Sequence, residues 1–580
     1  MTSNFSEKAA FLWSVADLLR GDYKPAGYGK VILPFTVLRR LDCVLEPTRD
    51  QVLKEYQNRK NFGIKDLSPF LLKVSGQKFY SVSRFTFPRL LDDPQHIRQN
   101  LESYLGDFSE NARDVFERFR FGEQISHLDS KNLLFMIVQK FATIDLHPNK
   151  VPNEEMGLIF EELIRKFSEA SNETAGEYFT PREVIRLMVN ILFVADDEAL
   201  SKPGVVRSLY DPAAGTGGML SVAEDYLREH NPDMHLTVFG QELNDESYSI
   251  CKADMMIKGQ DPDRIASGDS FSQDAFPQER FDYMLSNPPF GVDWKKFQDF
   301  IRNEHERKGY GGRFGPGLPR VSDGSLLFLL HLLSKMRPSD EGGSRIGIVL
   351  NGSPLFTGDA GSGESEIRRW ILENDWLEAI IAMPTDLFYN TGIATYVWIL
   401  SNRKSQERKS KVQLINAVDL YAKMRKSLGN KRNYLTDENI REITRVYGDF
   451  EHKGISKIFD TQDFGFRKIT IDCPPGSGKT VKAKKRQKPY DPDLRDTENV
   501  PLKEDLYEYF EREVKTHLPE AWINEEIRDE KDGKVGKVGY EINFNRYFYV
   551  YNPPRSLEEI RAEILDMEKK FLELLKGVTQ

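Results

Sequence analysis

Hydrophobic residues recur at intervals of three and four positions in the first quarter of the chain. The segments FLWSVADLLRG (residues 11–21) and YGKVILPFTVLRRLDCVL (residues 28–45) show this spacing most clearly. Gly21 and Pro47 follow the two segments as helix stops. Such spacing places apolar side chains on one face of a helix. We therefore expect residues 1–150 to form a helical domain.

Between residues 205 and 400, short runs rich in β-branched residues alternate with helical stretches. VVRSLYD precedes the helical segment MLSVAEDYLREH, and HLTVFGQEL precedes NDESYSICKADMMIKG. Further strand-like runs are FDYMLS, RIGIVLNG, LEAIIAMP, ATYVWILSN and KVQLINAV. Alternation over this length predicts an α/β domain with a largely parallel, doubly wound sheet. We place this domain at residues 151–475.

The chain becomes charged and irregular after about residue 425. The stretch CPPGSGKTVKAKKRQKPYDPD, which begins at Cys473, is rich in Pro, Gly and Lys and predicts an exposed basic loop. It is a poor match to a phosphate-binding P-loop, because that pattern needs glycine where Cys473 stands. We assign residues 476–552 to this loop and the segment that follows it.

The last residues, 553–580, predict a single helix. Ser556 and Glu559 form a capping-box pattern at its start. Apolar residues then recur at 3-4-3-4-3 spacing, which is typical of a coiled-coil seam: Leu557, Ile560, Ile564, Met567, Phe571 and Leu574. The helix packs either on its own domain or against helices of a partner subunit, and the spacing alone leaves both open.

Composition and charge narrow the class of protein. The 580 residues are 39% hydrophobic and 29% charged, which is typical of a soluble protein with several domains. No apolar run approaches the ~20 residues that a membrane span needs. The cysteines at positions 43, 251 and 473 are far apart, which favours a reducing compartment and predicts a cytoplasmic location. Because the net charge is −9, any attraction to nucleic acid must come from a local basic surface or from a partner.

Candidate chemistry begins with the turn DPAAGTGG, from Asp211 to Gly218. The turn follows a strand and opens a helix, and its glycines let the backbone turn sharply and approach a ligand closely. The next strand ends at Glu242, where a carboxylate can accept hydrogen bonds from ribose hydroxyls. The spacing differs from the dinucleotide pattern GxGxxG. It therefore predicts a nucleotide-type site without indicating nicotinamide.

The run SNPPF (residues 286–290) ends another strand, at the edge where open α/β sheets bind ligands. Pro288 and Pro289 fix the backbone and remove two N–H donors. With the side-chain oxygen of Asn287, this stiff stretch offers acceptors to an –NH2 group, and Phe290 offers a face for a planar ring. A second Asn-Pro-Pro, at residues 552–554, leads into the C-terminal helix and predicts only a structural turn.

These acceptors suit an exocyclic amine on a planar base. The lone pair of such an amine is delocalised into the ring, so the nitrogen is a poor nucleophile. Accepting hydrogen bonds from both N–H groups favours a pyramidal nitrogen, which can then attack an electrophilic methyl group held in line by a cofactor.

In their order, these motifs resemble the modification (M) subunit of type I restriction–modification systems, a DNA adenine-N6 methyltransferase that uses S-adenosylmethionine (SAM). The resemblance covers nearly the whole chain, and the cofactor motif before NPPF is similar to the gamma order of amino-methyltransferases. It implies an α/β, Rossmann-like SAM-dependent methyltransferase domain with an N-terminal helical domain and a C-terminal helical tail. The segments that carry it are LWSVADLLRG, VILPFTVLRRL, AGEYFTPREVIRLMV, DPAAGTGGML, GQELN, SGDSF, SNPPFG, RIGIVLNGSPLF, AIIAMPTDLFYNTGIATYVWIL and NFNRYFYVYNPPRSLEEI.

The resemblance also implies roles for single residues. Asn287, Pro288 and Pro289 would hold the target amine, and Phe290 would stack on a base flipped out of the duplex. Residues 213–215 would meet the methionine part of SAM, Glu242 its ribose and Asp269 its adenine amino group. The cofactor pocket as a whole would be lined by Glu177, Tyr178, Phe179, Thr180, Pro181, Arg182, Asp211, Ala213, Ala214, Gly215, Thr216, Gly217, Glu242 and Asp269. No metal is expected.

The partners implied by the resemblance are duplex DNA, a specificity (S) subunit that reads its sequence, and restriction (R) subunits, with two M subunits for each S subunit. The C-terminal helix would be one place to dock the S subunit. Two other functions remain open. An NPPF motif would also serve cytosine N4, RNA or a protein glutamine, and a chain without catalysis could act as a scaffold.

Two surface segments are also candidates for contact with DNA. Residues 308–320, KGYGGRFGPGLPR, predict either a mobile lid over the flipped base or a disordered connection. The basic loop could touch phosphates, although a solvated loop is favoured; its cations are Lys479, Lys482, Lys484, Lys485, Arg486 and Lys488.

Overall fold

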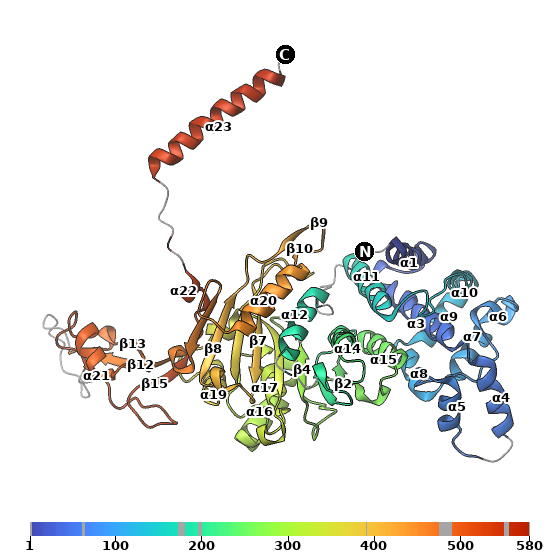
Figure 1. Cartoon of the computed structure of the whole chain (residues 1–580), viewed down its shortest axis with the longest axis horizontal. Helices are drawn as coiled ribbons and strands as arrows, with labels where there is room; N and C mark the ends of the chain where they lie inside the picture. Colours follow the sequence, from blue (N-terminus) through green and yellow to red (C-terminus); the bar gives the residue numbers. More distant parts are fainter. Residues whose placement is uncertain are drawn as a thin grey trace, which may run out of the picture. The chain divides into compact units, whose positions relative to one another are not determined.

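The computed structural model describes residues 3–60, 64–171, 180–194, 196, 200–389, 391–474, 490–549, 551 and 556–578. The chain divides into two compact units, residues 1–541 and 542–580 (Figure 1). Within the described part no helix is long and apolar enough to cross a membrane.

The first part of the larger unit is helical, as the hydrophobic spacing predicted. Its helices bury one continuous apolar core, in which aromatic residues such as Phe35, Phe121 and Phe141 pack ring against ring. The helices are α1 (Ser3–Trp13), α2 (Val15–Leu19), α3 (Gly29–Leu45), α4 (Arg49–Lys60), α5 (Ser68–Ser75), α6 (Phe87–Leu90), α7 (Ile97–Gly106), α8 (Glu110–Arg118), α9 (Phe121–Ser130), α10 (Leu134–Ala142) and α11 (Asn153–Ser171).

A nine-stranded sheet follows, in the order β11-β8-β6-β7-β5-β4-β1-β2-β3. Strands β3, β2, β1, β4 and β5 are parallel, β7 is antiparallel to both its neighbours, and β11 is antiparallel to β8. The predicted α/β fold with a largely parallel sheet is therefore confirmed. The strands are β1 (Val206–Asp211), β2 (His235–Glu242), β3 (Ile265–Ser267), β4 (Tyr283–Ser286), β5 (Arg345–Asn351), β6 (Leu377–Ala382), β7 (Thr395–Ser401), β8 (Lys411–Asn416) and β11 (Ser456–Asp460).

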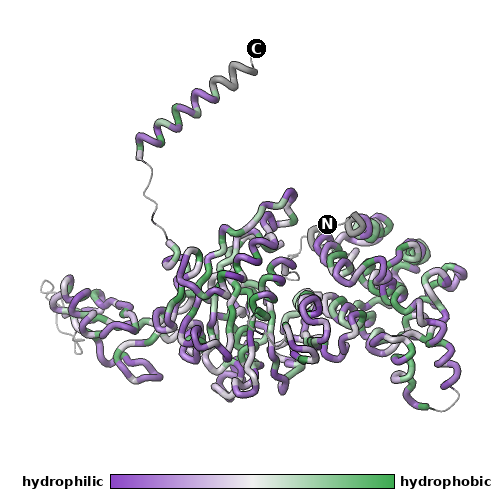
Figure 2. Tube along the Cα trace, in the orientation of Figure 1, coloured by the Kyte–Doolittle hydropathy of each residue, from purple (hydrophilic) through white to green (hydrophobic). Residues whose placement is uncertain are grey.

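Helices cover both faces of this sheet, and Figure 2 shows hydrophobic residues along its strands. One face packs with α12, α14, α15 and α20 in a single core. On the other face, α17 and α18 contact β5. The helices of this domain are α12 (Arg182–Phe193), α14 (Gly218–His230), α15 (Asp245–Ile257), α16 (Gln298–Lys308), α17 (Ser325–Ser334), α18 (Ser353–Phe356), α19 (Gly363–Glu373) and α20 (Asp437–Asp449), and a hairpin joins β9 (Ala422–Leu428) to β10 (Lys431–Tyr434).

The strand order reverses between β1 and β4. From β1 the chain moves outward through β2 to β3, and it then returns to place β4 on the other side of β1. Open α/β sheets bind ligands in the crevice at the carboxyl ends of the strands at such a point. Asp211 ends β1 and Asn287 follows β4, so the topology brings the two predicted motifs together.

Helix α15 joins the helical domain to the sheet. Its residues Ile250, Ala253 and Met256 belong to the helical core, whereas Cys251 and Met255 belong to the core beneath the sheet. The Lys252 Nζ also lies 2.6 Å from the Asp114 Oδ2 of α8. One helix buried in two cores gives the domains a fixed contact.

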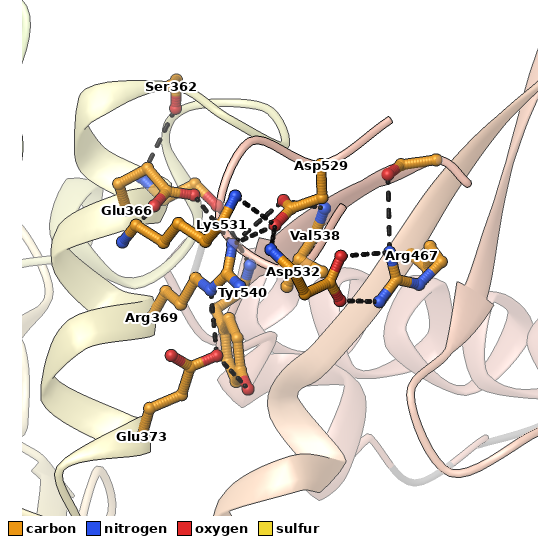
Figure 3. Close-up of polar contacts among 12 residues, drawn as sticks. Ser362, Glu366, Arg369, Glu373, Arg467, Asp529, Lys531, Asp532, Val538 and Tyr540 are labelled. Carbon is orange, nitrogen blue, oxygen red and sulfur yellow. Dashed lines mark hydrogen bonds and ion pairs between the residues drawn. The ribbon is translucent and has the colours of Figure 1, made fainter. Parts of the chain in front are cut away.

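A second, smaller sheet lies after β11 and was not predicted from the sequence. It is formed by β12 (Gly465–Asp472), β13 (Asp496–Pro501), β14 (Trp522–Ile523) and β15 (Lys537–Tyr540), with α21 (Leu506–Tyr509) alongside. A buried ion pair, 3.0 Å between Arg369 Nη1 on α19 and Asp529 Oδ2, attaches the loop before β15 to the main domain (Figure 3). Most of the predicted basic loop, which begins at Cys473, lies outside the described residues; its residues 475–489 include all six of the predicted cations.

The second unit contains α22 (Phe544–Phe548) and α23 (Leu557–Val578). The predicted capping box is present, because the Glu559 N–H donates to Ser556 Oγ and the Ser556 N–H donates to Glu559 Oε2. Along α23, the apolar residues Leu557, Ile564, Met567 and Phe571 are exposed. The second Asn-Pro-Pro, residues 552–554, lies outside the described residues.

Candidate active site

Asn287 lies at the carboxyl end of β4, where it lines two adjoining cavities. The smaller cavity contains residues of α11, the start of α12 and the glycine-rich turn. The larger one, of about 310 Å³, extends over the carboxyl ends of β1, β2 and β3. Asn287 and Ala213 line both cavities. The NPPF motif and the glycine-rich turn therefore lie at the same place in the structure.

The side-chain amide of Asn287 is held in one orientation. Its Nδ2 donates a hydrogen bond to the Thr180 Oγ1 at 2.9 Å. Its Oδ1 is buried and has no hydrogen-bond partner in the described structure. A buried acceptor without a partner is unfavourable in a folded protein. Because Asn287 lines both cavities, a ligand there is a candidate for the missing donor.

The glycine-rich turn adopts a conformation that side chains rarely permit. Gly215 and Gly217 have φ angles of 54° and 85°. A Cβ on Gly217 would also lie 2.8 Å from the Cys251 Sγ, so this position excludes any side chain. The turn leads directly into α14, whose first residues, Gly218 and Met219, line the smaller cavity.

Glu242 closes the other side of the turn. Its Oε2 accepts from the Gly215 N–H at 2.8 Å, and its Oε1 accepts from the Asn244 N–H at 2.7 Å. Burial raises the pKa of this carboxyl group, and the two N–H donors oppose that rise. Each oxygen keeps a further acceptor position, so Glu242 can still receive hydroxyl groups from a ligand.

Asp211 is buried at the end of β1. Burial raises the pKa of Asp211 to about 7, although the Ala213 N–H donates to its Oδ1 at 3.0 Å and favours the charged form. The negative charge of Glu242 adds to the rise. A carboxyl group near neutrality beside a cavity is a candidate functional group.

Asp269 also lines the larger cavity. Its Oδ1 accepts from the N–H groups of Phe271 and Ser272, which fixes the carboxylate at the start of a turn. Asp269 and Glu242 therefore line the same cavity.

Most of the predicted residues meet at the two cavities. Those that line them are Thr180, Asp211, Ala213, Ala214, Gly215, Thr216, Glu242, Asp269, Asn287 and Pro289. Gly217 lies in the same turn but faces Cys251 of α15 instead of either cavity. Residues Glu177, Tyr178 and Phe179 lie outside the described residues.

Besides Gly217, four predicted residues are not part of either cavity wall. Pro181 is the N-cap of α12, and Arg182 pairs with Glu161 at 3.1 Å. Pro288 is buried, and Phe290 packs edge-on against Phe388 with ring centroids 5.7 Å apart.

The structure adds wall residues that the sequence did not reveal. Glu161 of α11 reaches the smaller cavity, and burial raises its pKa while Arg182 opposes the rise. Leu243, Asn244 and Phe328 line the larger cavity. Leu243 and Asn244 directly follow Glu242, so proximity to that residue was an available signal. Glu161 and Phe328 come from helices that are distant in sequence, and no motif near them indicated that they line the site.

The segment 308–320 is anchored rather than a disordered connection. Arg313 donates from Nη1 to the Ser270 carbonyl oxygen at 2.9 Å and pairs through Nη2 with Glu304 at 2.6 Å. The segment therefore supports the loop that carries Asp269, instead of lying free above the site.

Comparison with known proteins places this chain in a family. Residues 152–466, more than half of the chain, match the family described as N-6 DNA methylase. Residues 8–141 match the HsdM N-terminal domain. The type I restriction enzyme MjaIX methylase subunit of Methanocaldococcus jannaschii is 29% identical over 478 residues, with 80% of each chain covered. The MjaVII methylase subunit of that organism is 29% identical over 338 residues, which cover 58% of this chain and 54% of that protein.

A solved structure supports the fold. The crystal structure of a type I restriction–modification methyltransferase subunit from Streptococcus thermophilus has a TM-score of 0.60 at 24% identity, covering 79% of this chain and 96% of that one. The chain therefore belongs to the N-6 DNA methylase family, and its two matched domains, in this order, make it a methylase subunit of the type I restriction–modification class.

Proposed function

We propose that this chain methylates adenine N6 in duplex DNA with SAM bound in the larger cavity and Asn287 holding the target amine. The observation that carries the proposal is the Asn287 Oδ1, a buried acceptor without a partner. It lies on a wall shared with the glycine-rich turn and the Glu242 and Asp269 carboxylates.

The residues present fit this cofactor. A volume of about 310 Å³ is at the lower end of small-molecule sites. Glu242 offers acceptor positions for ribose hydroxyls, and the Asp269 carboxylate offers one for an amino group. Ala213, Ala214 and Gly215 present backbone with little side chain in the way. When bound, SAM supplies a methyl group on a positively charged sulfur.

Asn287 prepares the amine for transfer. Because Thr180 accepts from Nδ2, the amide cannot turn its nitrogen to the cavity without losing that bond. The Oδ1 therefore accepts one N–H of the target, which draws the nitrogen lone pair out of conjugation with the ring. After transfer, the methylated amine carries an extra proton, which passes to solvent or to a nearby base. Asp211 and Glu161 are the candidate bases, because burial raises the pKa of both carboxyl groups.

The target base has to leave the duplex to reach Asn287, which costs a few kcal/mol. Phe290 is the last residue of NPPF, and its ring is half-buried against Phe388. We expect its free side to stack on the flipped base, which contributes roughly 1–3 kcal/mol.

The proposed function also requires partner subunits. With a net charge of −9, the chain needs help to bind DNA. We propose that a specificity subunit supplies sequence reading and docks on the exposed apolar residues of α23, with two copies of this chain per specificity subunit and restriction subunits added in the full, cytoplasmic complex. The type I methylase subunits to which the chain is similar support this assembly.

The test transfers labelled methyl groups from SAM to unmethylated DNA, with and without the specificity subunit, and digests the product to nucleosides. We expect the label in N6-methyladenosine and far more of it when the partner is present. Label in methylcytosine would contradict the adenine assignment, and no label with either preparation would favour a scaffold.

A further inference from the structure

A large groove of about 880 Å³ begins on the far side of the loop that carries Asp269, where Phe271 and Ser272 line it, and extends to the amino edge of the sheet. It shares no wall residue with the two cavities around Asn287. Arg280 precedes β4, Trp376 directly precedes β6, and Asn402 directly follows the antiparallel β7. All three positions are at the amino edge of the parallel strands. Strand β5 has seven residues, so about 20 Å of sheet, at ~3.3 Å per residue, separates this edge from the carboxyl edge.

The groove has an excess of positive charge, although the whole chain is acidic. Five basic and two acidic side chains line it. Both acids are already paired within the protein, Asp274 with Lys335 at 2.6 Å and Glu304 with Arg313 at 2.6 Å. Arg280 and Lys308, which are exposed at the wall, form no ion pair within the described structure. They are therefore available to an anionic ligand.

Aromatic rings share the groove with these cations. Trp370 and Trp376 pack edge to face with centroids 4.6 Å apart, and Tyr310 lies 6.4 Å from Trp370. Phe300 and Tyr310 are 45% and 59% exposed, so both rings are accessible to a ligand in the groove. Exposed rings beside unpaired cations are typical of sites that stack bases and hold phosphates.

The groove is bounded by a segment that is remote in sequence. Lys531, in the loop before β15, lies 2.6 Å from the Glu366 carboxylate (Figure 3). Its Nζ is also 5.7 Å from the centre of the Tyr310 ring. The same loop is fixed by the buried pair between Arg369 and Asp529. On the opposite side, Arg313 binds the carbonyl oxygens of Ser270 and Phe271. The walls are thus built from ordered, well-anchored elements.

We propose that this groove binds a nucleotide unit, a planar base that carries phosphate, at a site separate from the cofactor cavity. The rings around Trp370 would stack on the base, and Arg280 and Lys308 would bind the phosphate. A flipped target base is not the occupant, because that base has to reach the opposite edge of the sheet. The nucleotide unit comes either from a free nucleoside triphosphate or from a DNA strand.

The test uses the full-length chain and measures binding of three probes by calorimetry: ATP, an oligothymidylate and inorganic triphosphate. All titrations are repeated with saturating SAM. Two double variants are compared with the wild type. Arg280→Ala/Lys308→Ala removes the unpaired cations, whereas Arg441→Ala/Arg445→Ala removes the same charge from the exposed face of α20.

We expect ATP or the oligothymidylate to bind saturably, with SAM present or absent. The Arg280/Lys308 double variant should bind about tenfold more weakly, as expected for loss of charge-assisted contacts, and the α20 variant should bind like the wild type. Binding of ATP alone would identify a free nucleotide as the source, and binding of the oligothymidylate alone would identify a strand.

Four results would overturn the proposal. These are the absence of binding by both base-containing probes, an unchanged affinity in the Arg280/Lys308 variant, displacement of the probe by SAM, and binding of inorganic triphosphate as tight as that of ATP. The last would show an anion site without recognition of a base. Retained SAM binding by the variant serves as the check that it has folded.

Discussion

The Thr180 hydroxyl determines which end of the Asn287 amide faces the cavity. Because it accepts from Nδ2 at 2.9 Å, the Oδ1 is left without a partner, and we propose that it accepts from the substrate. We predict that Thr180→Val lowers the methyl-transfer rate about tenfold, the value of one hydrogen bond of ordinary strength. Thr180→Ser keeps the hydroxyl and should retain most of the rate. Equal rates in the two variants, at equal SAM affinity, would show that the hydrogen bond does not position the amide.

Asp211 gives the folded chain a pH dependence of its own. Its pKa is raised to about 7 in the folded protein, whereas in the unfolded chain it is near 4. Below pH 4 both states bind the proton, and as the pH rises towards 7 only the unfolded state releases it. Ionisation of Asp211 therefore lowers stability progressively between these values.

We predict that Asp211→Asn removes this component. The urea midpoint of the wild type should fall, relative to that of the Asn variant, between pH 5 and pH 8. A difference between the two proteins that is constant over this range would contradict the raised pKa.

At the scale of elements, the hydrophobic pattern predicted most of the main domain. Strands β1, β2 and β5 and helices α14 and α15 coincide with predicted segments, because each has a clear period and a turn at its end. The antiparallel direction of β7 was not predictable, since direction leaves no mark in the spacing of apolar residues. The small sheet was missed because β12 and β13 contain many polar residues and are separated by the charged loop.

The site likewise contains residues that the sequence predicted and contacts that it did not. The residues of the glycine-rich turn, Glu242 and Asp269 are close in sequence to recognisable motifs and were predicted. Thr180 and Asn287 are 107 positions apart, and their hydrogen bond depends on the packing of α12 against the sheet. No local pattern records such a contact.

Helix α23 also belongs to this scale. Its seam residues Ile564 and Met567 are 55% and 62% exposed. If the seam docks the specificity subunit, Ile564→Ser/Met567→Ser should weaken that association at least about tenfold, because each buried apolar side chain contributes ~1.5–3 kcal/mol. The control Glu563→Ser/Glu568→Ser alters the same helix at two charged positions. Equal association of both variants in a pull-down with the purified subunit would exclude the seam as the docking surface.

At the scale of the whole molecule, the chain combines the proposed methyl-transfer site with a net charge of −9. The site needs only local geometry, from the glycine turn to Asn287, whereas attraction to the DNA polyanion needs a source of positive charge. This division predicts that binding of the cofactor is a property of the single chain and that efficient transfer is a property of the assembly.

The most direct measurement compares single-turnover methyl transfer by wild type and Asn287→Ala, each assembled with the specificity subunit, alongside the SAM dissociation constant of each. Loss of a preorganised hydrogen-bond partner in the transition state should lower the rate by about a hundredfold or more. The SAM dissociation constant should stay within about twofold, because Asn287 is assigned to the amine and not to the cofactor. Transfer at the wild-type rate by the Ala variant would contradict the assignment of Asn287 as the residue that holds the target amine.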